Sequence, residues 1–300
     1  MSPHYNKYAV KTKILLETIG GYPRIGDEPR QQILRKTIDL WEKGKKIEKE
    51  LRRSQDDLTR EVILEQVECG IDIPTDGLVR WYDPISHIMQ RIGNVEIKGL
   101  LRFFDTNCYF RQPLIKGKPE WTRHILVDEF LFAKGVNESL AEPRFCVKQV
   151  LTGPYTLARH SIAGNYNVAK LTEALADVLA REVGELAKNG AKIIQIDEPS
   201  ILKNAGDWDL VASALEKIAR EKGGAMLSLA TYFGDAAPLY EKMQELPVVA
   251  LHFDLTYSPG IVDKVLSVGS KKLLGLGIVD GRNTRIEDAG EVARVVGRII

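Results

Sequence analysis

Cysteine is scarce in this sequence of 300 residues, and long apolar runs are missing. The three cysteines, Cys69, Cys108 and Cys146, are far apart and form no CxxC pair, which argues against a disulfide framework and favours a reducing compartment. No apolar run approaches the roughly 20 residues that a membrane span needs, and no apolar signal region with a small-residue cleavage site is present. We therefore expect a cytoplasmic protein that makes no contact with a membrane.

An excess of charge of one sign is also missing. The 42 Lys and Arg residues against 41 Asp and Glu residues give a net charge of +1, so no overall attraction to nucleic acid is expected. No G-x-G-x-x-G or Walker loop follows the first apolar run, which removes the main reason to expect a doubly wound nucleotide-binding sheet. The absence of a G-x-S-x-G elbow leaves a serine-hydrolase site unsupported.

Short apolar runs alternate with amphipathic segments along the chain. Between two of the runs, the stripe formed by Val168, Leu171, Leu175 and later apolar residues predicts a helix, with Asn167 as its N-cap and Gly190 as its stop. Strands that are apolar throughout and alternate with helices are typical of a parallel sheet covered on its outer face. The predicted strands span 13–21, 70–77, 95–104 or 110–117, 145–154, 192–200, 226–234, 248–256 and 272–281.

About eight such units favour one α/β domain, a single (β/α)8 TIM-type barrel over residues 1–300, with a doubly wound sheet as the alternative. Residues 1–10 are expected to be a loose tail. Residues 81–125 are richer in aromatics and proline, and we expect them to form an excursion over the barrel mouth or a purely structural insertion.

Polar side chains follow many of the predicted strands. In a parallel barrel the carboxyl ends of the strands build the active face, so these side chains predict a polar pocket for a small charged ligand. The candidate binding residues at or near this face are Arg24, Asp76, Trp81, Tyr155, Asp197, Glu198, Tyr232, His252, Asp254, Asp280, Arg282 and Asn283, with Thr152 and Thr231 beside them.

Structural roles compete with this interpretation. Asp76 and Asp280 are as readily explained by salt bridges or helix caps, and His252 by a hydrogen-bonded position in the core. Arg282 can pair with Asp280 or Asp254. For adjacent Asp197 and Glu198, strand alternation predicts opposite faces, so that one acid enters the pocket and the other holds the fold.

The motifs IGGYPRIG, GIDIPTDGLVRWYD, FFDTN, LTGPYT, IIQIDEP, ATYFGD, LPVVALHFDL and GLGIVDGRN together resemble the cobalamin-independent methionine synthase family, from about Thr18 to Asn283. Members of that family are typically two fused (β/α)8 barrels, of which the C-terminal one carries zinc and homocysteine and transfers a methyl group from a folate polyglutamate. In their residues, these motifs resemble the N-terminal barrel of the family.

The resemblance also implies that this chain lacks the family's zinc motif. The family's catalytic barrel has an H-x-C zinc motif at the position of LATYF, where this chain has Ala230 and Tyr232. The expectation is therefore no metal in this chain, zinc in a separate catalytic partner barrel, and no methionine synthesis by the chain alone. Asp254 matches a further acid of that motif, and Asp197 and Glu198 match the acids near the family's amino acid substrate.

In the family, a basic stretch after the PRIG turn contacts the glutamate tail of the folate. The matching stretch here is DEPRQQILRK, so the resemblance implies that Arg30, Arg35 and Lys36 bind this tail. Charge-assisted hydrogen bonds to several carboxylates suit such side chains, although cations on a helix are as often simply solvated. Asp27, Glu28 and Pro29 depart from the family's pattern.

Two other functions remain open from the sequence. The first is a stand-alone single-barrel methyltransferase with a different methyl donor, which needs zinc and for which His252, Asp254 and Cys146 are the candidate ligands. The second is a non-enzymatic folate-binding module.

Overall fold

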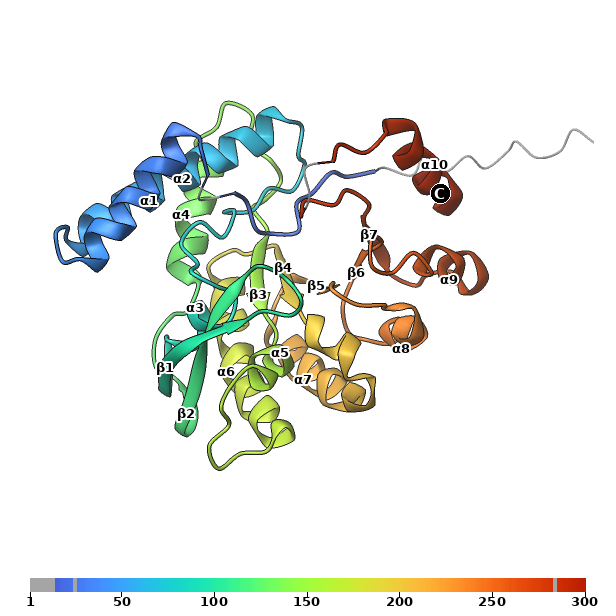
Figure 1. The fold of residues 1–300 in the computed structure, drawn as a ribbon. Helices are drawn as coiled ribbons and strands as arrows, with labels where there is room; N and C mark the ends of the chain where they lie inside the picture. Colours follow the sequence, from blue (N-terminus) through green and yellow to red (C-terminus); the bar gives the residue numbers. More distant parts are fainter. Residues whose placement is uncertain (1–13, 24–25, 283–284) are drawn as a thin grey trace, which may run out of the picture.

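A parallel sheet forms the centre of the molecule. The computed structural model describes residues 14–23, 26–282 and 285–300. Five neighbouring parallel strands follow one another in chain order, which is the order expected of a barrel (Figure 1). They are β3 (Gln149–Thr152), β4 (Ile193–Asp197), β5 (Met226–Thr231), β6 (Ala250–Asp254) and β7 (Leu273–Gly277).

Two further segments extend this sheet beyond β3. The backbone N–H of Lys148 donates to the carbonyl of Pro74, and Ile73 forms a parallel bridge with Glu17. The runs predicted at 13–21 and 70–77 therefore take the first two strand positions. Within the described residues, no strand pairing joins β7 to the segment around Glu17.

Helices separate successive strands and lie around the outside of the sheet, where α6, α7, α8 and α9 follow one another in Figure 1. Among the described residues, no helix is long and apolar enough to cross a membrane. The helices are α1 (Pro29–Glu42), α2 (Glu48–Glu68), α3 (Ser86–Met89), α4 (Val127–Glu138), α5 (Pro154–Arg159), α6 (Val168–Lys188), α7 (Trp208–Glu221), α8 (Tyr240–Met243), α9 (Ile261–Val268) and α10 (Ala289–Ile299), with short 3-10 turns η1 (Pro199–Lys203), η2 (Ala205–Asp207) and η3 (Ala237–Leu239).

Helix α6 confirms the prediction made from its apolar stripe. The side chain of Asn167 accepts a hydrogen bond of 2.9 Å from the backbone N–H of Lys170, as an N-cap does. Gly190, two residues beyond the helix, has a φ of +92°, a conformation that favours glycine.

The third predicted strand was wrong. Both of its alternatives belong to an antiparallel hairpin, β1 (Ile92–Arg102) and β2 (Tyr109–Trp121), which forms a sheet of its own. Charged Glu96 and Lys98 alternate with apolar residues in this stretch. This pattern suits a strand with one solvated face rather than a strand buried on both sides.

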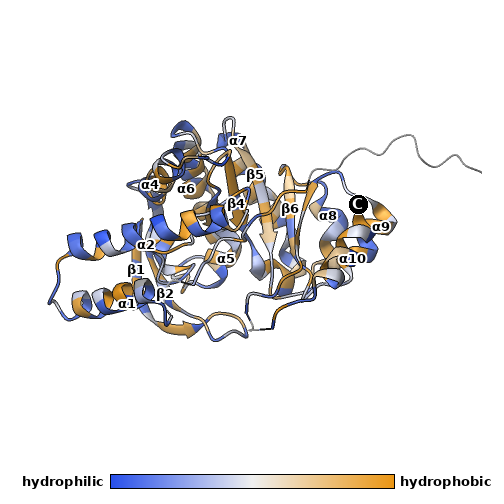
Figure 2. Ribbon diagram, turned by 90° about the horizontal axis from the view of Figure 1, so that it is seen from above, coloured by the Kyte–Doolittle hydropathy of each residue, from blue (hydrophilic) through white to orange (hydrophobic). Residues whose placement is uncertain are grey.

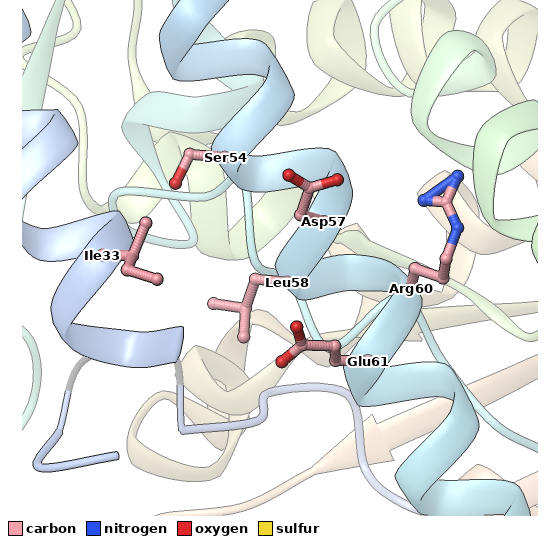
Figure 3. A pocket seen from close by; sticks show the side chains of 6 residues that line it. All are labelled: Ile33, Ser54, Asp57, Leu58, Arg60 and Glu61. Carbon is pink, nitrogen blue, oxygen red and sulfur yellow. The ribbon is translucent and has the colours of Figure 1, made fainter. Parts of the chain in front are cut away.

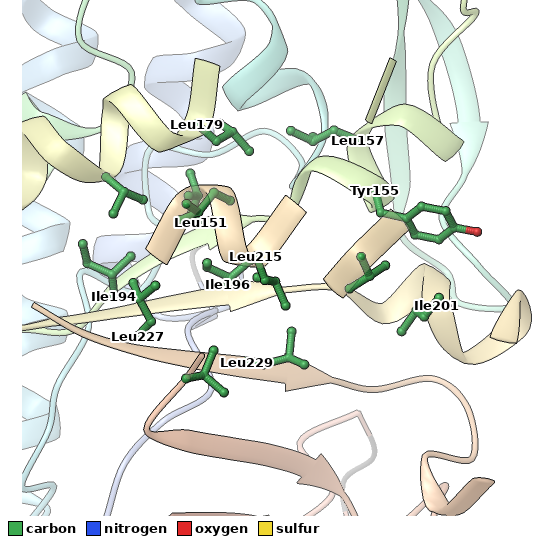
Figure 4. Close-up of a cluster of buried hydrophobic side chains, with 14 of the residues drawn as sticks. Leu151, Tyr155, Leu157, Leu179, Ile194, Ile196, Ile201, Leu215, Leu227 and Leu229 are labelled. Carbon is green, nitrogen blue, oxygen red and sulfur yellow. The ribbon is translucent and has the colours of Figure 1, made fainter. Parts of the chain in front are cut away.

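The apolar core fills the space between the sheet and its outer helices. Figure 4 shows Ile194, Ile196, Leu227 and Leu229 packed with residues of the helices, and all four are at most 1% exposed. In Figure 2 strand β4 is orange, whereas the helices carry both orange and blue turns. Burial of apolar side chains on this face contributes most of the stability of such a fold.

Candidate functional site

The other face of the sheet, here called the inner face, carries polar side chains. Strand register places Gln195 of β4 beside Ser228 of β5, and Asp197 beside Ala230. Ala230 in turn pairs with His252 of β6. Side chains of paired residues share a face, so polar groups of three strands meet here.

A charged cluster shows that the sheet curves around this inner face. Glu17 Oε1 lies 2.8 Å from His252 Nδ1, and Glu17 Oε2 lies 2.9 Å from Nζ of the fully buried Lys148. Gln195 Nε2 also donates to the carbonyl of Ile19 at 2.6 Å. The first segment pairs with the segment around Ile73, which in turn lies beside β3, yet the first segment also reaches β6 and β4, so the sheet bends as a barrel does.

The electrostatics of this cluster favour an ionised Glu17. Burial raises the pKa of Glu17, but the hydrogen bonds and positive charges of His252 and Lys148 outweigh that effect and lower it to about 2. Gly275 of β7 makes room for His252, because a Cβ at this glycine would overlap the imidazole ring. His252 thus has the hydrogen-bonded, buried position that was the structural alternative for it.

Asp197 lies at the carboxyl end of β4 on the inner face. Its Oδ1 accepts a hydrogen bond of 2.8 Å from Gln195 Nε2, and its Oδ2 accepts one of 3.0 Å from the hydroxyl of Tyr232. Burial raises the pKa of Asp197 to about 7, against the effect of these two donors. A carboxyl group with this pKa can take up or release a proton near neutral pH.

Glu198, the next residue, turns to the outer side. Its carboxylate accepts hydrogen bonds from the backbone N–H groups of Tyr155 at 2.9 Å and Thr156 at 2.7 Å, and from the Thr156 hydroxyl at 2.7 Å. Burial raises the pKa of Glu198 to about 7, although these donors oppose the rise. Gly153 is needed there, because a Cβ would overlap the carboxyl group. Glu198 therefore fixes the start of α5, whereas Asp197 makes its hydrogen bonds on the inner face.

Arg282 joins the loops that follow β6 and β7. Its Nε lies 2.7 Å from Asp280 Oδ1, its Nη1 lies 3.0 Å from Asp254 Oδ2, and its Nη2 donates to Thr256. The guanidinium carbon also lies 4.5 Å from the ring centre of Tyr257. Both ion pairs that the sequence suggested as alternatives are thus present at once.

Three candidates lie away from the inner face. Asp76 Oδ1 accepts from the N–H of Leu78 at 2.9 Å, and burial together with the charge of Glu129 raises its pKa to about 6. Trp81 is 4% exposed and donates from Nε1 to Glu129 at 3.2 Å. The Tyr155 hydroxyl donates to Asp207 at 2.7 Å.

The candidates for binding a glutamate tail lie at the start of the chain. Arg24 and Asn283 lie outside the described residues, as does the side chain of Arg30. Arg35 and Lys36 are exposed on α1. Near them, a hollow of about 270 Å³ opens between α1 and α2 (Figure 3). Its lining contains both signs of charge and consists of Ile33, Ser54, Asp57, Leu58, Arg60 and Glu61.

Sequence reasoning missed Glu17, Lys148 and Gln195. All three interrupt apolar strand runs, namely ILLETI, FCVKQVL and IIQID. A charged or amide residue inside an otherwise apolar strand, with hydrophobic neighbours on both sides, was the signal that could have identified the polar inner face.

The residues at this site do not fit a metal ion. Across the part of the chain that the structure describes, no group of three or more His, Cys, Asp or Glu side chains is arranged to hold one. Ala230 offers no donor, Asp254 is paired with Arg282, and His252 with Glu17. Burial raises the pKa of Cys146 to about 11, which disfavours the thiolate that zinc requires.

Comparison with known proteins identifies relatives of this chain. The sequence profile described as "Cobalamin-independent synthase, N-terminal domain" matches residues 93–300. A methionine synthase of Saccharolobus solfataricus is 32% identical over 280 residues, which are 92% of this chain and 82% of the relative. One from Sulfurisphaera tokodaii is 33% identical over 279 residues, 90% of this chain and 78% of the relative.

Solved structures show the same fold. A B12-independent methionine synthase from a Shewanella species, in complex with selenomethionine, matches with a TM-score of 0.70 and 21% identity over 85% of this chain and 79% of that chain. A putative vitamin-B12 independent methionine synthase from Listeria monocytogenes matches with a TM-score of 0.67 and 16% identity over 93% of this chain and 87% of that one. With the curved parallel sheet, these likenesses confirm the prediction of a barrel-type α/β fold.

Proposed function

This chain belongs to the cobalamin-independent synthase family, within its N-terminal domain group, and we propose that it contributes to methyl transfer from 5-methyltetrahydrofolate polyglutamate to homocysteine together with a separate zinc-bearing catalytic barrel. In this proposal the chain supplies binding surface, and the partner supplies the Lewis acid that activates the homocysteine thiol.

The observation that carries the proposal is the pair formed by Tyr232 and Asp197. Tyr232 stands where the family's catalytic barrel has the cysteine of its zinc motif, and its hydroxyl is used as a donor to Asp197 at 3.0 Å. Ala230 stands where the motif has its histidine. The position of the metal ligands is thus filled by a hydrogen-bonded polar pair that suits an organic ligand.

In this proposal the side chains of the inner face have different roles. Asp197, with a pKa of about 7, accepts hydrogen bonds from N–H donors of the ligand in its ionised form and donates a proton when neutral. Gln195 and Tyr232 fix the orientation of its carboxyl group. The remaining candidates at the strand ends, Asp254, Asp280 and Arg282, shape the rim through their mutual ion pairs.

The glutamate tail is assigned to the exposed cations of α1. Arg35 and Lys36 are exposed, as contact with a flexible, solvated chain of carboxylates requires, and Arg30 lies in the first turn of the same helix. Such contacts lower the Michaelis constant for a long tail more than for a short one. They leave the chemical step to the partner.

Reconstitution tests the proposal. The chain, a zinc-bearing catalytic barrel of a cobalamin-independent methionine synthase, and their mixture are each given homocysteine and 5-methyltetrahydrofolate triglutamate, and methionine is measured by mass spectrometry. We expect no methionine above the blank from the chain alone, with or without added zinc. The mixture should exceed the rate of the catalytic barrel alone by about tenfold or more, because positioning of a bound donor accounts for rate effects of that size or larger.

A matched pair of variants sharpens the test. Tyr232→Phe removes the donor to Asp197 and should lower the rate of the mixture, whereas Tyr109→Phe, on an exposed tyrosine, should leave it unchanged. Methionine formation by the chain alone would replace the proposal with a stand-alone methyltransferase. Tight folate binding without any gain in the mixture would replace it with a binding module.

A further inference from the structure

Two buried polar groups on the inner face have no hydrogen-bond partner among the described residues. They are the amide oxygen Oε1 of Gln195, whose side chain is fully buried, and the hydroxyl of Ser228, which is 3% exposed. Strand register places the two residues opposite each other on β4 and β5. Buried polar atoms are nearly always bonded to protein or to an ordered water, so two neighbouring groups without partners point to a common guest.

The amide of Gln195 cannot be turned to satisfy its oxygen. Its Nε2 donates to the carbonyl of Ile19 at 2.6 Å and to Asp197 Oδ1 at 2.8 Å. The carbonyl, and the carboxylate of Asp197 in its ionised form, only accept hydrogen bonds. A reversed amide would place Oε1 against these two acceptors. The oxygen therefore keeps its direction and needs a donor other than Asp197.

The surroundings of the two groups supply room and a donor. Ser228 pairs with Ala250 of β6, so the row across the inner face continues with a small side chain. Lys148 is fully buried in the same interior, where its Nζ donates to Glu17 Oε2 at 2.9 Å and its positive charge lowers the pKa of Asp197. An ammonium has three N–H donors, so Lys148 can bind a further acceptor. A water at this place finds the two to four polar partners that a buried water needs.

We propose that the inner face holds an ordered water between Gln195 and Ser228, and that Ser228 acts through this water as a positioning residue for Asp197. The water donates to Gln195 Oε1 and to the Ser228 hydroxyl, and it accepts from Lys148 Nζ. With its oxygen bonded in this way, the amide of Gln195 directs Nε2 to the carboxyl group of Asp197. The inference goes beyond the proposed function, because it holds whichever ligand Asp197 binds.

A third buried hydroxyl, that of Thr231, provides a contrast. Thr231 of β5 is 3% exposed, and its Oγ1 also lacks a partner in the part of the chain that the structure describes. Alternation along β5 places it on the outer face, and its neighbour in register is Phe253, which offers no polar side chain. A single hydroxyl in apolar surroundings does not hold a water, so Thr231 is a matched control for Ser228.

Threonine and valine at position 228 test the proposal, because the two side chains have nearly the same shape and differ in the hydroxyl. Ser228→Thr keeps the bond to the water, whereas Ser228→Val removes this bond and fills the site with a methyl group. NMR of carbon-labelled aspartate measures the pKa of Asp197, which is about 7 in the wild type. We expect this pKa to be unchanged in Ser228→Thr and raised in Ser228→Val, because the hydrogen bond from Gln195 that lowers it is lost.

Thr231→Val is the control for the loss of a buried hydroxyl. It should leave the pKa of Asp197 unchanged and should not lower the urea midpoint, because it removes a polar group that had no partner. If Ser228→Val does not fold, Ser228→Ala, which adds no atoms, takes its place with the same expected direction.

A crystal structure of the wild-type chain gives a second, independent measurement. It should show a water within hydrogen-bond distance of Gln195 Oε1 and Ser228 Oγ, and the same water should remain in Ser228→Thr.

The outcomes separate this inference from the proposed function. Equal pKa values of Asp197 in Ser228→Thr and Ser228→Val would overturn the positioning role of Ser228. A wild-type crystal structure without a water at Gln195 Oε1 would overturn the water site. Neither outcome bears on the proposed function, which methionine formation in the reconstituted mixture tests.

Discussion

On strand β4, Ile194 and Ile196 point toward the helices, whereas Gln195 and Asp197 point to the inner face. The outer face is closed by apolar packing, and the inner face is held by hydrogen bonds and ion pairs among Glu17, Lys148 and their partners. Apolar packing is insensitive to pH and stabilises the fold. A network of buried charges adds less stability and responds to protonation and to ligands. The proposed function accordingly assigns stability to the outer face and ligand binding to the inner face.

The largest effect is expected on the outer face. Ile196→Ala leaves a cavity in the core and should lower the free energy of unfolding by about 2–5 kcal/mol, as measured by urea denaturation. Ile286→Ala is the matched control, because Ile286 is 92% exposed and its truncation should change stability by less than about 0.5 kcal/mol. Equal effects at both positions would contradict the core assignment.

The second-largest effect on stability is expected for Glu198→Gln. The amide keeps one acceptor but replaces the other with a donor, so one N–H or hydroxyl of α5 is left without its partner. We expect a loss of about 2–4 kcal/mol in the free energy of unfolding. Glu173→Gln, at an exposed glutamate of α6, serves as control and should be nearly neutral. A neutral Glu198→Gln would show that the carboxylate does not hold the start of α5.

The ionisation of Asp197 should make the stability of the wild type fall as pH rises toward neutrality. Its pKa of about 7 in the folded state lies above its ordinary value of 3.8, so its contribution to stability is fully present below 3.8 and is lost as pH rises to 7. The Asp197→Asn variant does not lose stability in this way over that pH range. Relative to the wild type, it should gain about 2–4 kcal/mol between pH 4 and pH 8 in urea denaturation. A constant difference between the two proteins across this range would contradict the raised pKa.

Glu17 should respond at acid pH. Its pKa of about 2 lies below its ordinary value of 4.5, so its contribution is present above 4.5 and is lost as pH falls toward 2. The wild type should lose about 2–3 kcal/mol more than Glu17→Gln between pH 5 and pH 2.5. Parallel acid denaturation curves for the two proteins would show that Glu17 is not held ionised by His252 and Lys148.

The smallest effect on stability is expected on α1. Arg35→Ala and Lys36→Ala should each change the free energy of unfolding by less than about 0.5 kcal/mol, because both side chains are exposed. If they bind the glutamate tail, their removal should weaken binding of a triglutamate folate and leave the monoglutamate unaffected. Equal weakening for both folates would place the tail elsewhere.

Periodicity predicted the strands β3 to β7 and helix α6 because burial on both faces and a single apolar stripe leave direct marks in sequence. The same reasoning placed Asp197 and Glu198 on opposite faces. It assigned the hairpin to the barrel because Val95 and Ile97 resemble a strand, although the charged Glu96 and Lys98 beside them fit a strand with one solvated face. The position of Lys148 inside an apolar run was a local signal, but its partner, Glu17, is 131 positions away, and no local pattern records so distant an ion pair.

The most direct test of the division between the two faces is the affinity of Asp197→Asn for 5-methyltetrahydrofolate triglutamate, measured by calorimetry at pH 7 beside the wild type. The account predicts an intact fold and binding weakened at least about tenfold, since a charge-assisted acceptor is replaced by a neutral amide. Wild-type affinity in this variant would contradict the account and move the ligand away from the inner face.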